Sequence, residues 1–225
     1  LTIAIDYEKM DSMTKEELFE LAYKDEITGY NNWNWLLEKI HTGKAAKVGN
    51  FSFMHFDLKK FKMINEIYSH EFADEALRQV CRALEAEENK DWIYFACRCD
   101  NDNFAALIKE MSEEETEKRV MKLFDSISHL PGDPSYHLYY RCGVAMVEKE
   151  VEFAILADMG KMAQRMGRRQ NVSEVHFYTK EMRDEQVRGE QLKAYLDTAI
   201  ANDEFVVYFQ PKYNRYPTHN RNHRK

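Results

Sequence analysis

The chain has 225 residues, of which 44% are hydrophobic and 13% aromatic, enough to form the core of one good-sized domain with an appendage. Its formal net charge is −7, which argues against partners that require a basic protein face, namely nucleic acid and anionic membranes. No apolar run approaches the length of a membrane span, so no membrane contact is expected in this segment.

The four cysteines of the chain are Cys81, Cys97, Cys99 and Cys142. They form no Cys-x-x-Cys pair and have no spacing typical of a His/Cys metal site. We expect Cys97 and Cys99 to point to opposite faces of one strand, and all four residues to be free thiols. Free thiols indicate a reducing compartment, which predicts a cytoplasmic protein.

The N-terminal part has a helical pattern from residue 13, which "TGYNN" interrupts before "NWNWLLEKIH" begins a second helix. Residues 1–22 are interpreted as an N-terminal linker helix. The nearly continuous apolar run "VGNFSFMHFDL" ends in Asp57 and predicts a central strand that is buried on both faces. An amphipathic helix, "ADEALRQVCRALEAEE", follows.

Two predicted strands, "WIYFACR" and "NFAALIKE", then flank a short polar stretch, "DNDN". The segment "SEEETEKRVMKLFDSISHL" predicts a helix, "PGDP" ends it, and "YHLYYRCGVAMV" predicts one further strand. From 51 to 147 the order is βαββαβ, which predicts an α+β fold, an α/β sandwich with a ferredoxin-like, palm-type core. A further helix at about 151–166 and a strand at about 174–178 are expected.

This order brings two distant acidic residues together. In a ferredoxin-like sheet the first strand lies antiparallel beside the third, so Asp57 and Asp102 should share one sheet edge and lie close enough to share a cation. Carboxylate oxygens suit Mg²⁺, which is often held by one or two carboxylates and substrate phosphates. The pair suggests phosphoryl or nucleotidyl transfer. The alternative, which spacing alone favours, is a strand end beside a solvated turn.

Three segments together resemble the GGDEF, or diguanylate cyclase, family. "DEITGYNNW" (25–33) resembles D-x-L-T-G-x-x-N-R, and "FDLKKFKMINEIYSHEFADEAL" (56–77) resembles F-x-D-x-D-x-F-K-x-I-N-D-x-x-G-H-x-x-G-D-x-x-L. "RCDNDNF" (98–104) stands where R-x-G-G-[DE]-E-F belongs. The resemblance covers residues 23–180. It implies the palm-like fold of nucleotide cyclases. It also implies the activity of the family, the condensation of two GTP molecules into cyclic di-GMP by a homodimer in which each protomer contributes one half-site.

The resemblance also implies roles for single residues. Asp57 and Asp102 match the metal-binding positions, which implies Mg²⁺ as cofactor. Asn65 and Asp74 match the positions that hydrogen-bond guanine, and an amide with a carboxylate can read the edge of that base. For these two residues the alternative is a helix surface and a helix N-cap.

The chain departs from the family pattern in the hairpin itself. Asp100 and Asn101 replace two glycines, which allow a backbone to approach phosphates closely. Asn103 replaces a glutamate and, being neutral, is no general base, whereas Asp102 and Phe104 are retained. The sequence therefore predicts a degenerate motif without a confident catalytic residue.

Two basic residues are the phosphate-binding candidates that the resemblance implies. Lys62 lies in the long block, and Arg165 lies in "MAQRMGRRQNV", which loosely matches A-K-x-x-G-R-N. For Arg165 the alternative is a solvated basic helix end. The family's product-inhibition motif, R-x-x-D, is expected to be absent, because its positions hold Asp91 and Tyr94.

A second resemblance begins after the first ends. "EQLKAYLDTAIANDEFVVYFQPKYN" (190–214) resembles the start of an EAL domain, the cyclic di-GMP phosphodiesterase. Residues 181–214 are therefore expected to be the edge of an adjoining EAL domain, with a helix over 180–202, followed by a polar basic tail at 215–225. The apolar stretch "EFVVYFQPKY" lacks a partner sheet and should be poorly ordered, packed on the first domain, or paired with another chain.

These observations favour a regulatory module in cyclic di-GMP signalling, a catalytically inactive domain that binds GTP or another guanine nucleotide. Two alternatives remain open on the sequence. One is an active diguanylate cyclase with a variant motif, and the other is a dimerisation scaffold without a ligand.

Overall fold

The computed structural model describes residues 13–146 and 151–210. The expectations for residues 1–12 and for the tail at 215–225 lie outside these residues. The chain divides into two units, one up to Arg183 and one from Asp184. Within the described ranges, no helix is long and apolar enough to cross a membrane.

A five-stranded sheet organises the first unit, in the order β2-β3-β1-β6-β7. Neighbouring strands are antiparallel except for β6 and β7, which are parallel. This order confirms the predicted α+β, ferredoxin-like core with an added strand. The strands are β1 (Phe51–Leu58), β2 (Ile93–Asp100), β3 (Asn103–Lys109), β6 (Tyr140–Ala145) and β7 (Glu174–Phe177).

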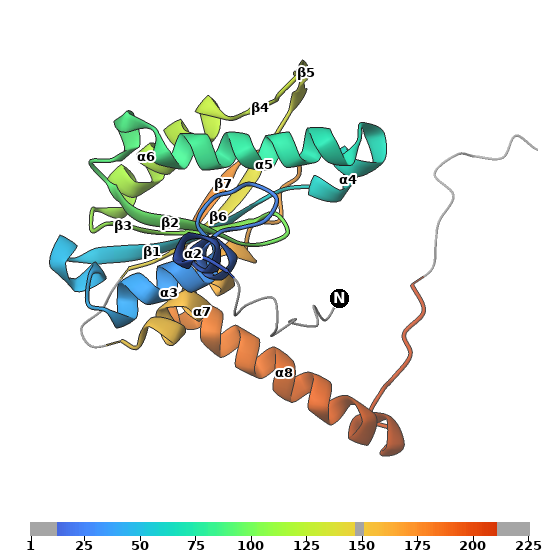
Figure 1. The fold of residues 1–225 in the computed structure, drawn as a ribbon. Coiled ribbons are helices and arrows are strands. Elements are labelled where there is room, and N and C mark those ends of the chain that lie inside the picture. Colours follow the sequence, from blue (N-terminus) through green and yellow to red (C-terminus); the bar gives the residue numbers. More distant parts are fainter. Residues whose placement is uncertain (1–12, 147–150, 211–225) are drawn as a thin grey trace, which may run out of the picture. The chain divides into compact units, whose positions relative to one another are not determined.

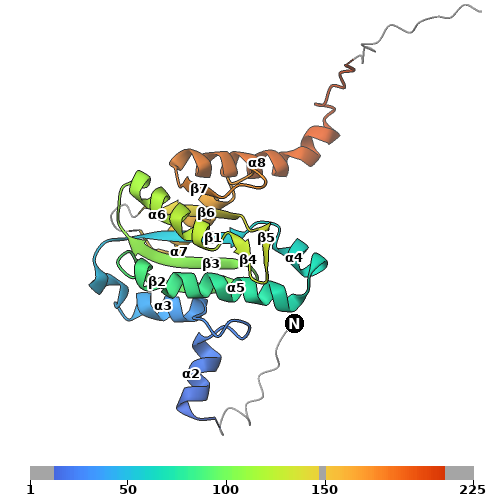
Figure 2. The same ribbon diagram turned by 90° about the horizontal axis from the view of Figure 1, so that it is seen from above.

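Helices cover both faces of this sheet, with α5 and α6 on one face and α3 and α7 on the other (Figure 1; Figure 2 gives the view from above). Helices α2, α4 and α8, two short 3₁₀ helices and a separate two-stranded sheet of β4 and β5 complete the described elements. The helices are α2 (Lys15–Tyr23), α3 (Trp33–His41), α4 (Phe61–Ile67), α5 (His70–Glu85), α6 (Glu113–Ser126), α7 (Phe153–Gln164), α8 (Lys180–Ala201), η1 (Ala45–Val48) and η2 (Glu87–Asn89).

Strand β1 supplies side chains to two separate cores, as its continuous apolar run predicts. Met54 and Phe56 pack on the side of α5 and α6, whereas Phe53 packs on the side of α3 and α7. On the second side, α7 lies close against β6, since a Cβ atom on Gly143 would overlap the carbonyl oxygen of Gly160. The absence of a side chain at Gly143 therefore sets the distance between α7 and the sheet.

Two predicted boundaries are wrong. The run "YHLYYRCGVAMV" is not one strand, because β5 (Asp133–His137) pairs with β4 (His129–Leu130) in a separate hairpin and β6 begins at Tyr140. Helix α5 begins three residues before the predicted start. The Ser69 hydroxyl caps it by accepting from the Phe72 N–H at 3.4 Å, so Asp74 lies inside the helix and is no N-cap.

The expected placement of Cys97 and Cys99 is also wrong. Residues two apart in a strand point to the same face. Cys97 belongs to the core beneath α3 and α7, and Cys99 packs against that core. The expectation of free thiols is confirmed for all four cysteines, which lie within the described residues.

The predicted helix over 180–202 is confirmed as α8, most of which belongs to the second unit. Its apolar residues Leu192, Leu196 and Ile200 are exposed. Residues 204–210 form no helix or strand. Their five large apolar side chains, from Phe205 to Phe209, are 60% to 92% exposed. Residues 211–214 of the expected EAL edge lie outside the described ranges.

Candidate functional site

A cleft of about 410 Å³ opens where β1 ends and the β2–β3 hairpin turns. Asp57 and Asp102 both line it, so the structure brings these distant acidic residues to one sheet edge, as expected. The cleft contains three aspartates and three cationic side chains. Its lining residues are His55, Asp57, Cys99, Asp100, Asp102, Asn103, Arg141, Lys161, Gln164 and Arg165.

Strand register explains which residues flank Asp57. On one side β1 pairs with β3, and Asp57 lies opposite Asn103. On the other side β1 pairs with β6, and Asp57 lies opposite Arg141. Because directly opposed side chains of antiparallel strands are close neighbours, Asp57 has an amide on one side and a guanidinium on the other.

The hairpin keeps its tight turn without glycine. Asn101 adopts the left-handed conformation, with φ of 43°, which asparagine tolerates better than most residues. Arg98 supports the turn, because its Nε donates to the Asn101 carbonyl oxygen at 3.0 Å. Across the base of the turn, the Asn103 amide donates to the Asp100 carboxylate at 2.8 Å. Asn103 is therefore committed to its own hairpin.

The Asp57 carboxylate is bound by Arg141. Its Oδ1 accepts from Arg141 Nε at 2.8 Å, and its Oδ2 accepts from Nε at 2.9 Å and from Nη2 at 2.5 Å. The Asp57 side chain is only 7% exposed, whereas that of Arg141 is 41% exposed. Hydrogen bonding to Asp57 raises the pKa of Arg141, so the guanidinium stays charged across the physiological range.

Asp102 has a different environment. Burial, followed by the like charge of Asp57, raises its pKa to about 6. In the described chain its carboxylate has no ion-pair partner, and the charge of Arg141 offsets the shift only in part. Asp102 therefore carries an energetic cost when it is ionised at neutral pH.

The floor of the cleft is a buried polar contact between β1 and α7. His55 Nδ1 lies 2.8 Å from Gln164 Oε1, and the buried Gln164 Nε2 has no hydrogen-bond partner among the described residues. Gln164 stands at the lysine position of the A-K-x-x-G-R-N segment. Hydrogen bonds involving Cys97 and His55 lower the pKa of the neighbouring Cys99 thiol, against the opposing effect of burial.

These residues do not fit the Mg²⁺ ion that the resemblance implies. Both oxygens of Asp57 already accept from Arg141, and Asn103 is a neutral amide bound to Asp100. Lys59 stands at the second acidic position of the D-x-D pattern and pairs with the buried Glu174. Within the described residues, no group of three or more His, Cys, Asp or Glu side chains is placed to hold a metal ion.

The remaining predicted residues lie apart from this lining. Asn65 on α4 and Asp74 on α5 are partly exposed and sit on two helices in contact with each other. Lys62 is 88% exposed on α4 and lies 3.6 Å from Glu66. The exception is Arg165, at the C-cap of α7, which lines the cleft.

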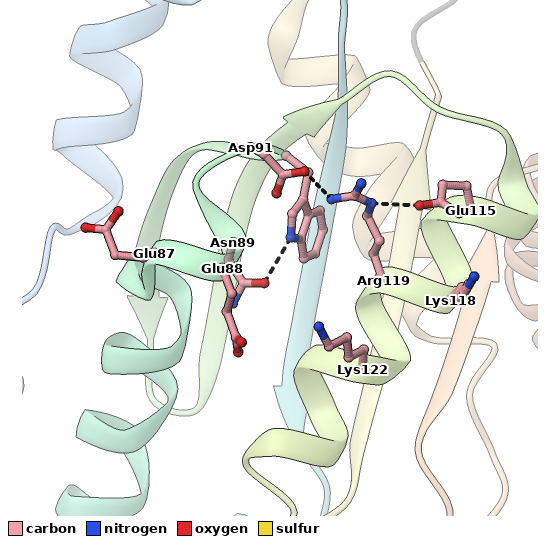
Figure 3. A pocket seen from close by; sticks show the side chains of 9 residues that line it. Glu87, Glu88, Asn89, Asp91, Glu115, Lys118, Arg119 and Lys122 are labelled. Atoms are coloured by element: carbon pink, nitrogen blue, oxygen red, sulfur yellow. Dashed lines mark hydrogen bonds and ion pairs between the residues drawn. The ribbon is translucent and has the colours of Figure 1, made fainter.

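A second pocket, of about 430 Å³, lies between η2, the start of β2 and α6. Figure 3 shows Arg119 reaching between two carboxylates, those of Asp91 and Glu115, at 2.7 and 2.8 Å. Trp92 also lines this pocket, and its indole N–H donates to the Asn89 side chain. Asp91 therefore stands at the arginine position of the product-inhibition motif, and its carboxylate is paired with Arg119.

The sequence interpretation missed Arg141 and Gln164, of which Arg141 contacts Asp57 directly. A signal was available, because Arg141 interrupts the apolar run of β6 and a charge in a buried strand needs a partner. The identity of that partner depends on the β1–β6 register, which the sequence does not reveal.

Comparisons with known proteins add independent findings. A family model described as "Diguanylate cyclase, GGDEF domain" matches residues 22–171. The chain is 25% identical over 202 residues to the "Cyclic di-GMP phosphodiesterase PdeR" of Escherichia coli, an alignment that covers 88% of this chain and 30% of that protein. It is 21% identical over 212 residues to the "Signaling protein YkoW" of Bacillus subtilis, an alignment that covers 89% of this chain and 26% of that protein. The chain thus spans less than a third of the length of either relative.

A solved structure shows the same fold. The coiled coil and GGDEF domain of DgcB from Caulobacter crescentus, in complex with c-di-GMP, matches with a TM-score of 0.60 at 16% identity. The match covers 72% of this chain and 88% of that chain. At this identity the likeness is evidence for the fold alone.

Proposed function

The chain belongs to the diguanylate cyclase GGDEF domain family, and from this premise we propose that it is a regulatory module of cyclic di-GMP signalling. In this proposal it binds a guanine nucleotide weakly and does not condense GTP. The observation that carries the proposal is the hairpin, where the neutral Asn103 replaces the glutamate and donates a hydrogen bond to Asp100.

Loss of turnover follows from the chemistry that condensation requires. Attack by a 3′-hydroxyl on a phosphate needs an activated oxygen and concentrated positive charge around the phosphate. Here a neutral amide stands in place of the glutamate, and the Asp100 side chain adds negative charge beside the cleft. Removing one preorganised electrostatic group typically costs about 10² to 10³ in rate. Several such groups are altered together in this hairpin.

Guanine recognition is assigned to Asn65 and Asp74. Within the described residues, neither side chain forms a hydrogen bond or an ion pair, so both are available to a ligand. A carboxylate accepts hydrogen bonds from the N1–H and amino groups of guanine, and an amide can both donate and accept. This donor and acceptor set favours guanine over adenine.

The proposed context is a longer protein in the cytoplasm. The resemblance of residues 190–214 to an EAL domain supports an adjoining phosphodiesterase domain, and the relative from Escherichia coli is named as such an enzyme. The nucleotide state of this module would then be passed to that domain. A homodimer, which the family half-site implies, is part of the same proposal.

The test is a calorimetric titration of the chain with GTP and with ATP, in Mg²⁺ and in EDTA, followed by chromatography of the products. We expect weak binding of GTP, at least about tenfold weaker binding of ATP, and no cyclic di-GMP. The double variant Asn65→Ala and Asp74→Ala should abolish the preference for GTP. Formation of cyclic di-GMP by the unmodified chain would establish an active cyclase, and no nucleotide binding at all would favour a scaffold.

A further inference from the structure

We propose that the guanidinium of Arg141 is the resident cation of the cleft and takes the place of a divalent metal ion. The cleft would then bind the phosphate groups of its ligand directly, in the absence of metal. The ligand class, a nucleotide phosphate, rests on the proposed function, whereas the replacement of the metal does not.

The geometry of the pair supports this assignment. Nε and Nη2 of Arg141 together contact both oxygens of Asp57, at 2.5 to 2.9 Å. This two-point contact fixes the plane of the guanidinium as well as its distance, which a lysine ammonium cannot do. At the nearly buried Asp57 carboxylate, a metal ion would have to compete with Arg141 for both oxygens.

The balance of charge leads to the same conclusion. Three carboxylates, those of Asp57, Asp100 and Asp102, line the same cleft, and their like charges repel one another. Arg141 pairs with Asp57 and lines the cleft together with the other two carboxylates. One fixed guanidinium thus supplies, at the Asp57 carboxylate, the positive charge that a bound metal ion would provide there.

Arg141 also retains donors for a ligand. A guanidinium carries five N–H groups, and within the described residues its Nη1 forms no hydrogen bond. The side chain is 41% exposed and lines the cleft together with Lys161 and Arg165. Planar guanidinium donors match phosphate oxygens well. These three cations form a surface on which a phosphate group can bind directly.

The first experiment uses Mn²⁺ alone as the probe, so that its result does not depend on nucleotide binding. Mn²⁺ affinity is measured by electron paramagnetic resonance for the parent chain, Arg141→Ser and the control Arg165→Ser. The control removes a positive charge from the same cleft without freeing Asp57. We expect the parent and the control to bind weakly and Arg141→Ser to bind at least about tenfold more tightly. Adding Asp57→Asn to Arg141→Ser should remove the gain. Equal affinity of the parent and Arg141→Ser overturns the proposal.

A second experiment uses the unmodified chain, so it tests the proposal even if the Arg141→Ser variant does not fold. The unmodified chain is titrated with inorganic pyrophosphate in EDTA and in Mg²⁺. We expect affinities within about threefold of each other. A requirement for metal, or no binding in either buffer, overturns direct binding of phosphate. If GTP does not bind but Arg141→Ser binds Mn²⁺ more tightly than the parent, the proposed nucleotide function is wrong and the assignment of Arg141 as the resident cation is supported.

Discussion

Arg98 and Asp25, 73 residues apart in the chain, form an ion pair in which Arg98 Nη1 lies 2.6 and 2.7 Å from the two carboxylate oxygens of Asp25. The Arg98 side chain is only 4% exposed, and its Nε also donates to the carbonyl oxygen of Asn101. Asp25 in turn accepts from the N–H and the hydroxyl of Thr28. One arginine thus joins the N-terminal turn to the hairpin of the cleft.

The substitution Asp25→Asn should destabilise the domain by about 3 kcal/mol, because it leaves the buried Arg98 charge without its partner. Urea unfolding at pH 7 measures this change. Asp91→Asn is the matched control, since Asp91 also pairs with an arginine but is largely exposed, and we expect it to change stability little. Equal effects of the two substitutions would contradict the structural role of the pair.

The same pair predicts a loss of stability in acid. Burial would raise the pKa of Asp25, but hydrogen bonds from Thr28 and Arg98 outweigh it and lower the pKa. The unfolded chain therefore takes up the proton first, and the contribution of Asp25 is lost as pH falls below about 4. In Asp25→Asn, this part of the decline below about pH 4 should be missing from the urea-unfolding profile.

Asp102 predicts a pH dependence of the opposite sign. Its pKa is raised to about 6 by burial and by Asp57, so the folded state takes up the proton before the unfolded chain does. At pH 7, Asp102→Asn should stabilise the domain by about 1 kcal/mol, since partial solvent exposure screens much of the effect. This advantage should shrink as pH falls from 7 to 4. A variant that is less stable than the parent at pH 7 would show that the Asp102 carboxylate is stabilising as an ion.

Restoring the hairpin motif alone should not restore condensation of GTP. The triple variant Asp100→Gly, Asn101→Gly and Asn103→Glu recreates the loop, but Arg141 still covers Asp57. Adding Arg141→Ser should raise the yield of cyclic di-GMP by at least about 100-fold, the scale of one preorganised electrostatic group. Adding Arg165→Ser instead controls for the lost charge. If the triple variant formed cyclic di-GMP as fast as the variant that also carries Arg141→Ser, Arg141 would not obstruct the site.

Gly143→Ala tests the close contact that positions α7. The added Cβ would overlap the Gly160 carbonyl oxygen and lie 2.9 Å from the carbonyl carbon of Ala163, so α7 has to move away from the sheet. We expect a loss of about 3 kcal/mol, at the upper end of the cost of overpacking. Gly189→Ala is the control, because that helical glycine has open space around it. We expect this substitution to stabilise the helix by about 1 kcal/mol. Thermal unfolding of both variants measures the difference.

The sequence by itself determined the main elements and their order. Apolar periodicity is a local property of the chain, so it predicted β1, β2, β3 and most helices. The strand order then placed Asp57 and the hairpin at one sheet edge, because ferredoxin-like topology leaves few alternatives. Prediction failed where a continuous apolar or aromatic run contains the end of one strand and the start of the next, as it does between β5 and β6.

Only the tertiary structure decided what these acidic residues contact. Asp57 meets Arg141 because β1 and β6 pair in one particular register, and a slip of one residue would have turned either side chain to the other face. Arg98 meets Asp25 because β2 lies beside the N-terminal segment. Contacts between residues that are 73 and 84 positions apart depend on the packed fold as a whole, and no local pattern in the sequence encodes them.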